Sequence, residues 1–270
     1  MKEKGKNKKI LNRQIQMYFK REFQYKGQMI AWIIADIIKI FGLCFIWLAA
    51  SRVSNVIDQE YIVSYYILVM FVSKFTSDYT VEFGVRNILD GRFSNFLVKP
   101  YNYLLEYLGT NIGSNILRII LFLPAFIIAI YFAWVNNFWI VEFNPYLILL
   151  SLIAILLGFG ISFLLGNIIS LAAVKIKEMD GIRIFYYNIA SLFSGEFIPI
   201  PFLPQIGRFL LELLPFRYTL SFPVEILLGR LNDYQKEIGF LTATVWLVIL
   251  FIIYKIVFKK AIKKYEAEGI

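Results

Sequence analysis

The 270-residue sequence has no histidine, a single cysteine, Cys44, and no GxxxxGK[ST] phosphate-binding loop. Without histidine, the chain lacks the commonest metal ligand and the commonest acid-base side chain. One cysteine excludes an internal disulfide. Because the phosphate loop is absent, the chain does not bind ATP in the P-loop manner. If nucleotide drives this protein, the ATPase is another subunit, which holds ATP and Mg, and this chain binds no cofactor of its own.

Charged residues are also scarce, at 17 % of the chain, whereas 59 % of its residues are apolar and the mean hydropathy is +0.65. Soluble domains do not have such a composition, so we predict an all-α membrane protein with several spans. The net charge of +9 comes from Lys and Arg at both termini and in loops beside the apolar segments. This distribution is the positive-inside pattern, which favours membrane lipid over nucleic acid as the partner of these charges.

Long apolar segments predict six transmembrane helices within one domain that covers residues 1–270. The predicted spans are about 29–50, 61–81, 111–134, 145–174, 182–198 and 238–257. In this assignment the cytoplasmic regions carry 20 Lys and Arg and the outward loops carry five. Both termini are therefore predicted to lie in the cytoplasm.

Residues 1–28 predict a basic helix that lies in the membrane interface. Nine Lys and Arg are interleaved with an apolar stripe at helical spacing, formed by Leu11, Ile15, Tyr18, Phe19 and Phe23. Such a helix anchors on anionic lipid of the inner leaflet. Gly109 and Gly113 form a GxxxG pair at the start of the third span, a spacing that lets helices approach closely but is weak evidence alone.

The segment 80–99 predicts an amphipathic helix, a turn at Asp90-Gly91 and a second short helix along the membrane. The side chains offered to the cytoplasm are Glu82, Arg86, Asn87, Asp90 and Arg92. Phe93 and Phe96 are expected to seat the segment in the membrane. The segment is either a passive interfacial helix or a docking surface for a soluble partner.

Five charged residues fall inside predicted spans: Asp36, Lys39, Lys74, Asp78 and Arg118. The first two are three residues apart and the next two are four apart, so each pair of opposite charges can share a helix face. Placing a charged side chain at the centre of a span costs about 2.5–3.5 kcal/mol of free energy unless it is paired with an opposite charge or hydrated. Structural pairing between helices, a water-filled pathway or gate, and misplaced span edges all remain open.

The stretch from Ser191 to Leu231 is too apolar for a loop in water and too interrupted for one span. Prolines 199, 201 and 204 force extended geometry, and we predict a short helix from near Pro204 to Pro215 and a second one that starts near Pro223. These helices are too short to cross the bilayer, so they should lie at its outer surface or dip in and return. Glu196, at the breaking point, is either a substrate or subunit contact or a plain helix-terminus residue.

Three pieces resemble, in the same order, the membrane subunits of type-2 ATP-binding-cassette (ABC) exporters: NILDGRFSNFLVKPYNYLLEYLG, then SGEFIPIPFLP with LLELLPFRYTLSFPVEILLGRL, and the closing KKYEAEGI. The branch is the six-span one described as "ABC-2 family transporter protein". The resemblance implies a multi-pass permease of a bacterial cell membrane, which is not an enzyme by itself. It implies a dimer with the same or a related permease, above two ABC ATPase subunits.

The resemblance also implies roles for two segments. The segment 80–97 would include the coupling helix that is seated in the ATPase, and 199–231 would be a re-entrant extracellular gate with Glu196, Pro199, Pro201 and Pro204. An ion-coupled secondary transporter, suggested by the intramembrane charges, and a non-transporting scaffold are the alternatives. No metal site is predicted, and drug, peptide, lipid and glycan cargoes all stay open.

Overall fold

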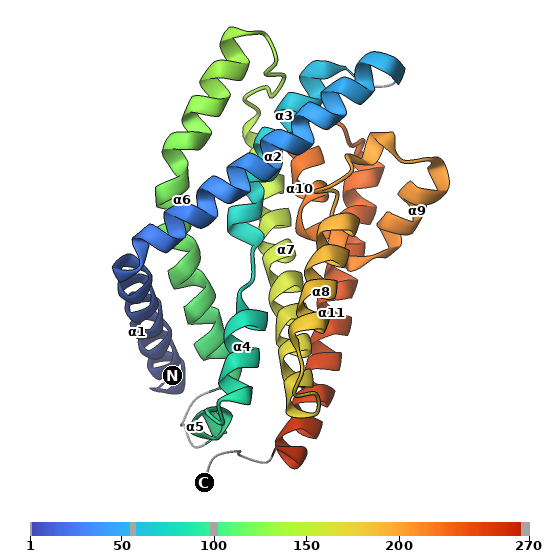
Figure 1. Ribbon diagram of the computed structural model, residues 1–270. Helices are drawn as coiled ribbons and strands as arrows, with labels where there is room; N and C mark the ends of the chain where they lie inside the picture. The colour runs from blue at the N-terminus through green and yellow to red at the C-terminus, as the bar shows by residue number, and fades with distance from the viewer. Residues whose placement is uncertain (1, 55–57, 98–101, 266–270) are drawn as a thin grey trace.

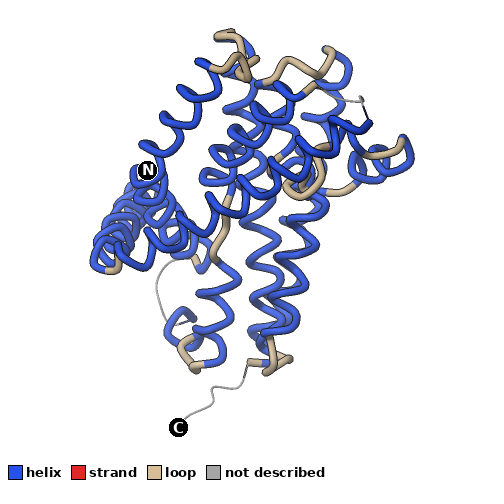
Figure 2. The backbone as a smooth tube through the Cα atoms, turned by 45° about the horizontal axis from the view of Figure 1, so that its top comes forward, coloured by secondary structure: helices blue, strands red, loops and turns tan. Residues whose placement is uncertain are grey.

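The computed structural model describes residues 2–54, 58–97 and 102–265, and the elements in these ranges are helices (Figures 1 and 2). The α-helices are α1 Lys2–Gln24, α2 Lys26–Ser54, α3 Gln59–Thr76, α4 Thr80–Leu89, α5 Phe93–Leu97, α6 Tyr103–Val135, α7 Pro145–Leu171, α8 Asp180–Phe193, α9 Gln205–Leu213, α10 Ser221–Leu227 and α11 Asp233–Lys264. Three short 3₁₀ helices are η1 Ala172–Val174, η2 Ile200–Phe202 and η3 Pro215–Thr219. The predicted all-α class is confirmed for the described residues.

Within the described residues, four helical segments are long and apolar enough to cross a membrane: Lys26–Arg52, Tyr103–Val135, Pro145–Val174 and Asp233–Lys264. They correspond to the first, third, fourth and sixth predicted spans. The second and fifth predicted spans correspond to α3 and α8, of 18 and 14 residues, and stay a prediction as spans. In Figure 1, α6, α7 and α11 run roughly upright, and α2 crosses their direction on a slant.

The second predicted span ends earlier than expected, because α3 stops at Thr76 and α4 starts at Thr80. Ser77 is extended, with φ −60° and ψ 135°. Two asparagines of α6 bond the broken backbone: Asn111 accepts from the Tyr79 amide at 2.7 Å, and Asn115 donates to the Ser77 carbonyl at 3.0 Å. The Tyr79 amide and the Ser77 carbonyl are therefore paired at the break, and neither incurs the free-energy penalty of an unpaired buried peptide group.

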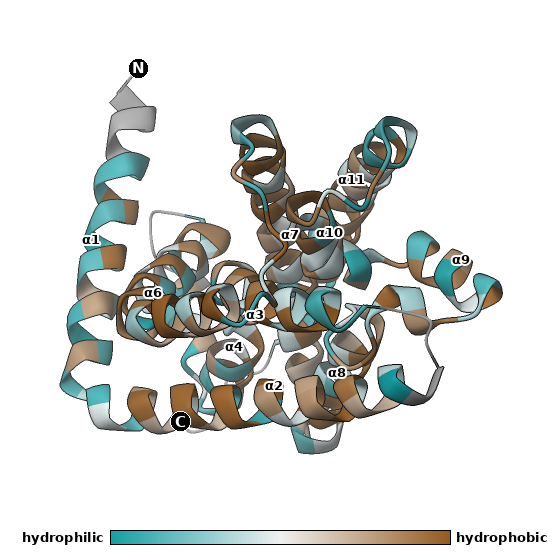
Figure 3. Cartoon of the chain, turned by 90° about the horizontal axis from the view of Figure 1, so that it is seen from above, coloured by the Kyte–Doolittle hydropathy of each residue, from teal (hydrophilic) through white to brown (hydrophobic). Residues whose placement is uncertain are grey.

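Helix α1 lies across one end of α6, as the view from above shows (Figure 3). The GxxxG glycines are the point of contact. A Cβ on Gly109 would come 2.5 Å from the Gln14 Cβ, and one on Gly113 would come 2.7 Å from the Ile15 carbonyl oxygen. The GxxxG spacing predicts that another helix approaches α6 closely, and this helix is α1.

Several predicted boundaries and positions need correction. Helix α6, which contains the third predicted span, begins at Tyr103, before residue 111, because Asn102 caps it by accepting from the Leu104 amide at 3.1 Å. The fifth ends at Phe193 rather than 198, because Gly195 takes a φ of +88° and stops the helix before the prolines. Residues 98–99 of the predicted coupling segment and 266–270 of the closing motif lie outside the described residues.

Phe93 does not seat its segment in lipid. Its side chain is fully buried and packs edge-on against Tyr103 and Tyr265, at centroid distances of 5.5 and 4.9 Å. Phe96 is half-buried and stacks on Tyr107 at 5.7 Å. Both aromatic rings hold α5 against the protein, since the apolar face of this short helix meets α6 and the end of the chain.

The predicted helices of the interrupted stretch are present. Helix α9 starts one residue after Pro204 and ends two residues before Pro215, and Pro223 lies in the first turn of α10. The apolar face of α9 is exposed, with Ile206 at 76 %. That of α10 is buried, and Val224 has no exposed surface.

Candidate functional site

An open cavity of about 800 Å³ lies between α2, the link from α3 to α4, α4 itself and α8. Its charged lining residues are Arg21, Glu22, Asp36, Lys39, Lys74, Asp78, Glu82, Arg86, Arg118, Arg183 and Glu196. All five predicted intramembrane charges are among them, together with two predicted coupling residues and the predicted gate acid. Three predicted groups of residues, the intramembrane charges, the coupling residues and the gate acid, therefore contribute to one cavity although they are far apart in the sequence.

Two of the intramembrane charges, Asp36 and Lys74, pair between helices. Lys74 of α3 donates to Asp36 of α2, and the ammonium group lies 5.5 Å from the centroid of the Phe122 ring. Lys39 does not pair with Asp36, and Lys74 does not pair with Asp78, although each pair could share a helix face. The Asp36–Lys74 pair is the structural pairing between helices that the sequence left open, and it forms because α2 and α3 lie side by side and α3 ends before Asp78.

Asp78 is buried at the break between α3 and α4. Its carboxylate accepts from the Thr80 hydroxyl and, at 3.1 Å, from the Thr80 amide. A Cβ on Gly166 of α7 would come 1.8 Å from Asp78 Oδ2, so this glycine leaves the space that the carboxylate fills. Asp78 is thus bound by the chain turn and directed toward α7.

Glu196, the predicted gate acid, pairs with Lys39 of α2. Its neighbours in the interrupted stretch are also bound: Trp47 Nε1 donates to the Phe197 carbonyl and the Tyr65 hydroxyl to the Gly195 carbonyl, each at 2.7 Å. Pro199 and Pro204 cap η2 and α9, and Pro201 lies inside η2. The stretch after α8 is therefore fastened to α2 and α3 by polar bonds.

At the other end of α8, Arg183 joins the helix to α4. It donates to Glu82 at 2.8 Å and pairs with Asp180 in its own first turn at 3.0 Å. Glu82, one of the predicted coupling residues, also lines the cavity. The chain thereby links the predicted coupling segment to the start of the predicted fifth span.

The remaining predicted coupling residues are spread around α4 and its turn. Arg86 is exposed and lines the cavity, and Asn87 donates to the Tyr107 hydroxyl at 3.0 Å. Asp90 and Arg92 are exposed at the turn after α4 and lie 3.5 Å apart. Only these last two present charge away from the cavity and the core.

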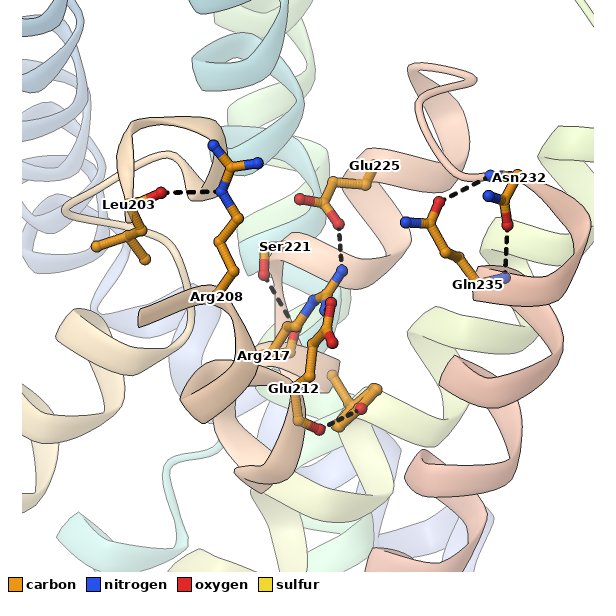
Figure 4. A network of polar contacts seen from close by, with 9 residues as sticks. Leu203, Arg208, Glu212, Arg217, Ser221, Glu225, Asn232 and Gln235 are labelled. Atoms are coloured by element: carbon orange, nitrogen blue, oxygen red, sulfur yellow. Dashed lines mark hydrogen bonds and ion pairs between the residues drawn. The ribbon is translucent and has the colours of Figure 1, made fainter. Parts of the chain in front are cut away.

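A buried ion network was missed by sequence reasoning (Figure 4). Arg217 of η3 donates to Glu225 of α10 at 2.7 Å and pairs with Glu212 of α9 at 2.8 Å. Burial lowers the pKa of Arg217, but the two carboxylates outweigh burial and hold this pKa above its ordinary value. The signal in the sequence is an arginine and a glutamate eight residues apart inside an apolar stretch, since charges there need partners.

These features define the protein as a helical multi-pass membrane protein with a charged cavity between its helices. Comparison with protein families adds the particular class: the family described as "ABC-2 family transporter protein" matches residues 29–269, so the chain belongs to that family. The chain is the membrane component of a transporter, as the resemblance in the sequence indicates. No curated protein and no solved structure matches it. No group of three metal-ligating side chains occurs among the described residues.

Proposed function

We propose that the chain is the permease subunit of an ABC transporter, which moves a substrate outward across the cell membrane. A separate ATPase subunit supplies the energy, because this sequence has no phosphate loop. The observation that carries the proposal is the cavity of about 800 Å³, with charges of both signs, between α2, α4 and α8 in a chain of this family. A volume of this size accommodates a small or drug-sized ligand.

The turn after α4 is the proposed contact with the ATPase. Leu89, Asp90 and Arg92 are exposed there, whereas Val85 and Ile88 bury the opposite face of α4 in the protein. Helix α4 is thus packed in the protein on one face, and the turn after it is exposed. A partner that binds this turn can move α4 and, through it, the helices that α4 contacts. Two ATPase subunits, with their ATP and Mg, would bind two permeases in this way.

The six-span topology with both termini in the cytoplasm is part of the same proposal. It places the turn after α4 on the ATPase side and the stretch from η2 to α10 at the outer surface, as a gate. Helix α8 carries exposed apolar side chains, among them Ile184 and Phe185 at 61 and 68 %. In the proposed dimer, lipid and a second permease, identical or related, cover such surfaces.

The test is reconstitution of the chain with a candidate ABC ATPase from the same organism. We expect the two to copurify and inside-out vesicles to accumulate a fluorescent amphiphile only with hydrolysable ATP. Transport that follows an ion gradient, and that persists with a catalytically dead ATPase, would instead support the secondary transporter. Copurification without any ATP-dependent transport across a panel of amphiphiles and peptides would support a scaffold.

The proposed contact has its own variant. Reversing both charges at the turn, with Asp90→Lys and Arg92→Glu, should abolish copurification of the ATPase. The matched control is Arg52→Glu, which changes an exposed arginine at the far end of α2. Unchanged copurification in the double variant would mean that the ATPase binds elsewhere.

A further inference from the structure

Three arginines from different helices lie along one face of α4. The Arg118 guanidinium of α6 lies 4.1 Å from the centre of the Tyr79 ring, and that of Arg21 of α1 lies 5.3 Å from the Phe83 ring. Arg86 belongs to α4 itself. Positions 79, 83 and 86 are spaced i, i+4 and i+7, which is one helix face. All three arginines line the cavity.

These arginines differ from the other cations of the cavity, which are matched by carboxylates. Lys74 has Asp36, Lys39 has Glu196 and Arg183 has Glu82. By contrast, the side chains of Arg21, Arg86 and Arg118 form no ion pair within the described ranges. Arg118 Nε is buried and has no hydrogen-bond partner there.

Two carboxylates near this face do not neutralise it. Asp78 is engaged by Thr80 and directed toward α7, as Gly166 indicates. Glu22 lines the cavity and is 3.5 Å from the Ser114 hydroxyl. Three guanidinium groups therefore outnumber the two carboxylates of Asp78 and Glu22, and the α4 face of the cavity keeps a net positive charge.

We infer that this face binds the anionic headgroup, a phosphate or carboxylate, of an amphipathic cargo. Guanidinium groups are suited to such oxyanions, because their planar array of donors binds two oxygens at once. Apolar and aromatic side chains at the same cavity, including Met29 and Trp32 of α2, would contact the hydrocarbon part. The inference rests on the proposed transport function and names its substrate class.

The test measures equilibrium binding to the purified full-length chain in a neutral detergent, without ATPase. The probe is a fluorescent short-chain phosphatidylglycerol, compared with phosphatidylcholine of the same chains. We expect tighter binding of the anionic probe, and a loss of about 10-fold or more when Arg118 or Arg86 is replaced by glutamine. The control is Arg13→Gln, an exposed arginine of α1 that does not line the cavity.

Arg118→Lys keeps the charge and should retain part of the preference. An unchanged thermal unfolding midpoint in the same detergent shows that each variant is folded. Because neither measurement needs the ATPase, failure of this inference stays distinct from failure of the transport proposal. The inference is overturned if the wild-type chain does not prefer the anionic probe, or if Arg13→Gln loses as much as Arg118→Gln. Displacement of the probe by inorganic phosphate at equal concentration would show that a soluble anion is the ligand, and would overturn the amphipathic cargo.

Discussion

The network around Arg217 gives a prediction whose size follows from burial. The Arg217 and Glu225 side chains are 8 % and 5 % exposed, whereas that of Glu212 is 49 % exposed. The two carboxylates bind the same guanidinium at similar distances, so geometry alone does not rank them. Exposure to solvent ranks them, because water screens and can replace the exposed carboxylate of Glu212 but not the buried one of Glu225.

Glu225→Ala leaves Arg217 buried with only its half-exposed partner. Breaking a buried pair costs about 3–5 kcal/mol, and we expect the lower end, about 3 kcal/mol, because Glu212 remains. Glu212→Ala should cost about 0–1 kcal/mol. Replacing both Arg217 and Glu225 by leucine removes the buried charges together and should cost less than Glu225→Ala alone.

Thermal unfolding in detergent, followed with a thiol-reactive dye, measures these differences at the single Cys44, which is partly buried in α2. At about 2–4 °C per kcal/mol for a chain of this size, Glu225→Ala should lower Tm by about 6–12 °C and Glu212→Ala by less than about 4 °C. Equal shifts for the two glutamates would refute the reasoning from burial. So would a double variant less stable than Glu225→Ala.

Three further sets of variants test other contacts of the structure. Gly113→Leu should push α1 away from α6 and cost at least about 1–3 kcal/mol, whereas Gly42→Leu, with no atom near its Cβ position, should be close to neutral in the same thermal assay. Lys39→Glu and Glu196→Lys should each raise the protease sensitivity of the stretch after α8, and the charge-swapped double variant should restore protection, unless the ion pair contributes nothing there. Phe93→Ala should cost about 3–5 kcal/mol because the ring is fully buried, while a ring seated in lipid would lose far less.

Features that depend on neighbouring residues were predictable from the sequence. The bounds of α9 follow from Pro204 and Pro215, because proline constrains its own φ and the residue before it. The stop after α4 follows from Gly91, which takes a φ of +73°. In both places, local covalent geometry decides the structure, and no distant contact is needed.

Partners across helices were not predictable in the same way. Asp36 has an opposite charge one turn away, but its partner is Lys74 of the neighbouring helix. Helical periodicity identifies the residues on one face and not the element that covers this face, which is also why Phe93 was assigned to lipid. Asn111 and Asn115 were the available clue to the early end of α3, since an amide in an apolar span needs a backbone or side-chain partner.

The links at the two ends of α8 connect these observations to transport. No side chain of this helix is fully buried, and its apolar packing on the core comes from the half-buried residues Ile182, Tyr186 and Tyr187. Its start is joined to α4 through Arg183 and Glu82, and the stretch after its end is joined to α2 through Glu196 and Lys39. A displacement of α4 by the proposed ATPase would therefore reach the stretch after α8 along this helix, because an ion pair joins each end of it to a neighbouring element. Glu82→Gln should then uncouple ATP hydrolysis from transport without releasing the ATPase, and loss of copurification in that variant would show that Glu82 serves the ATPase contact instead.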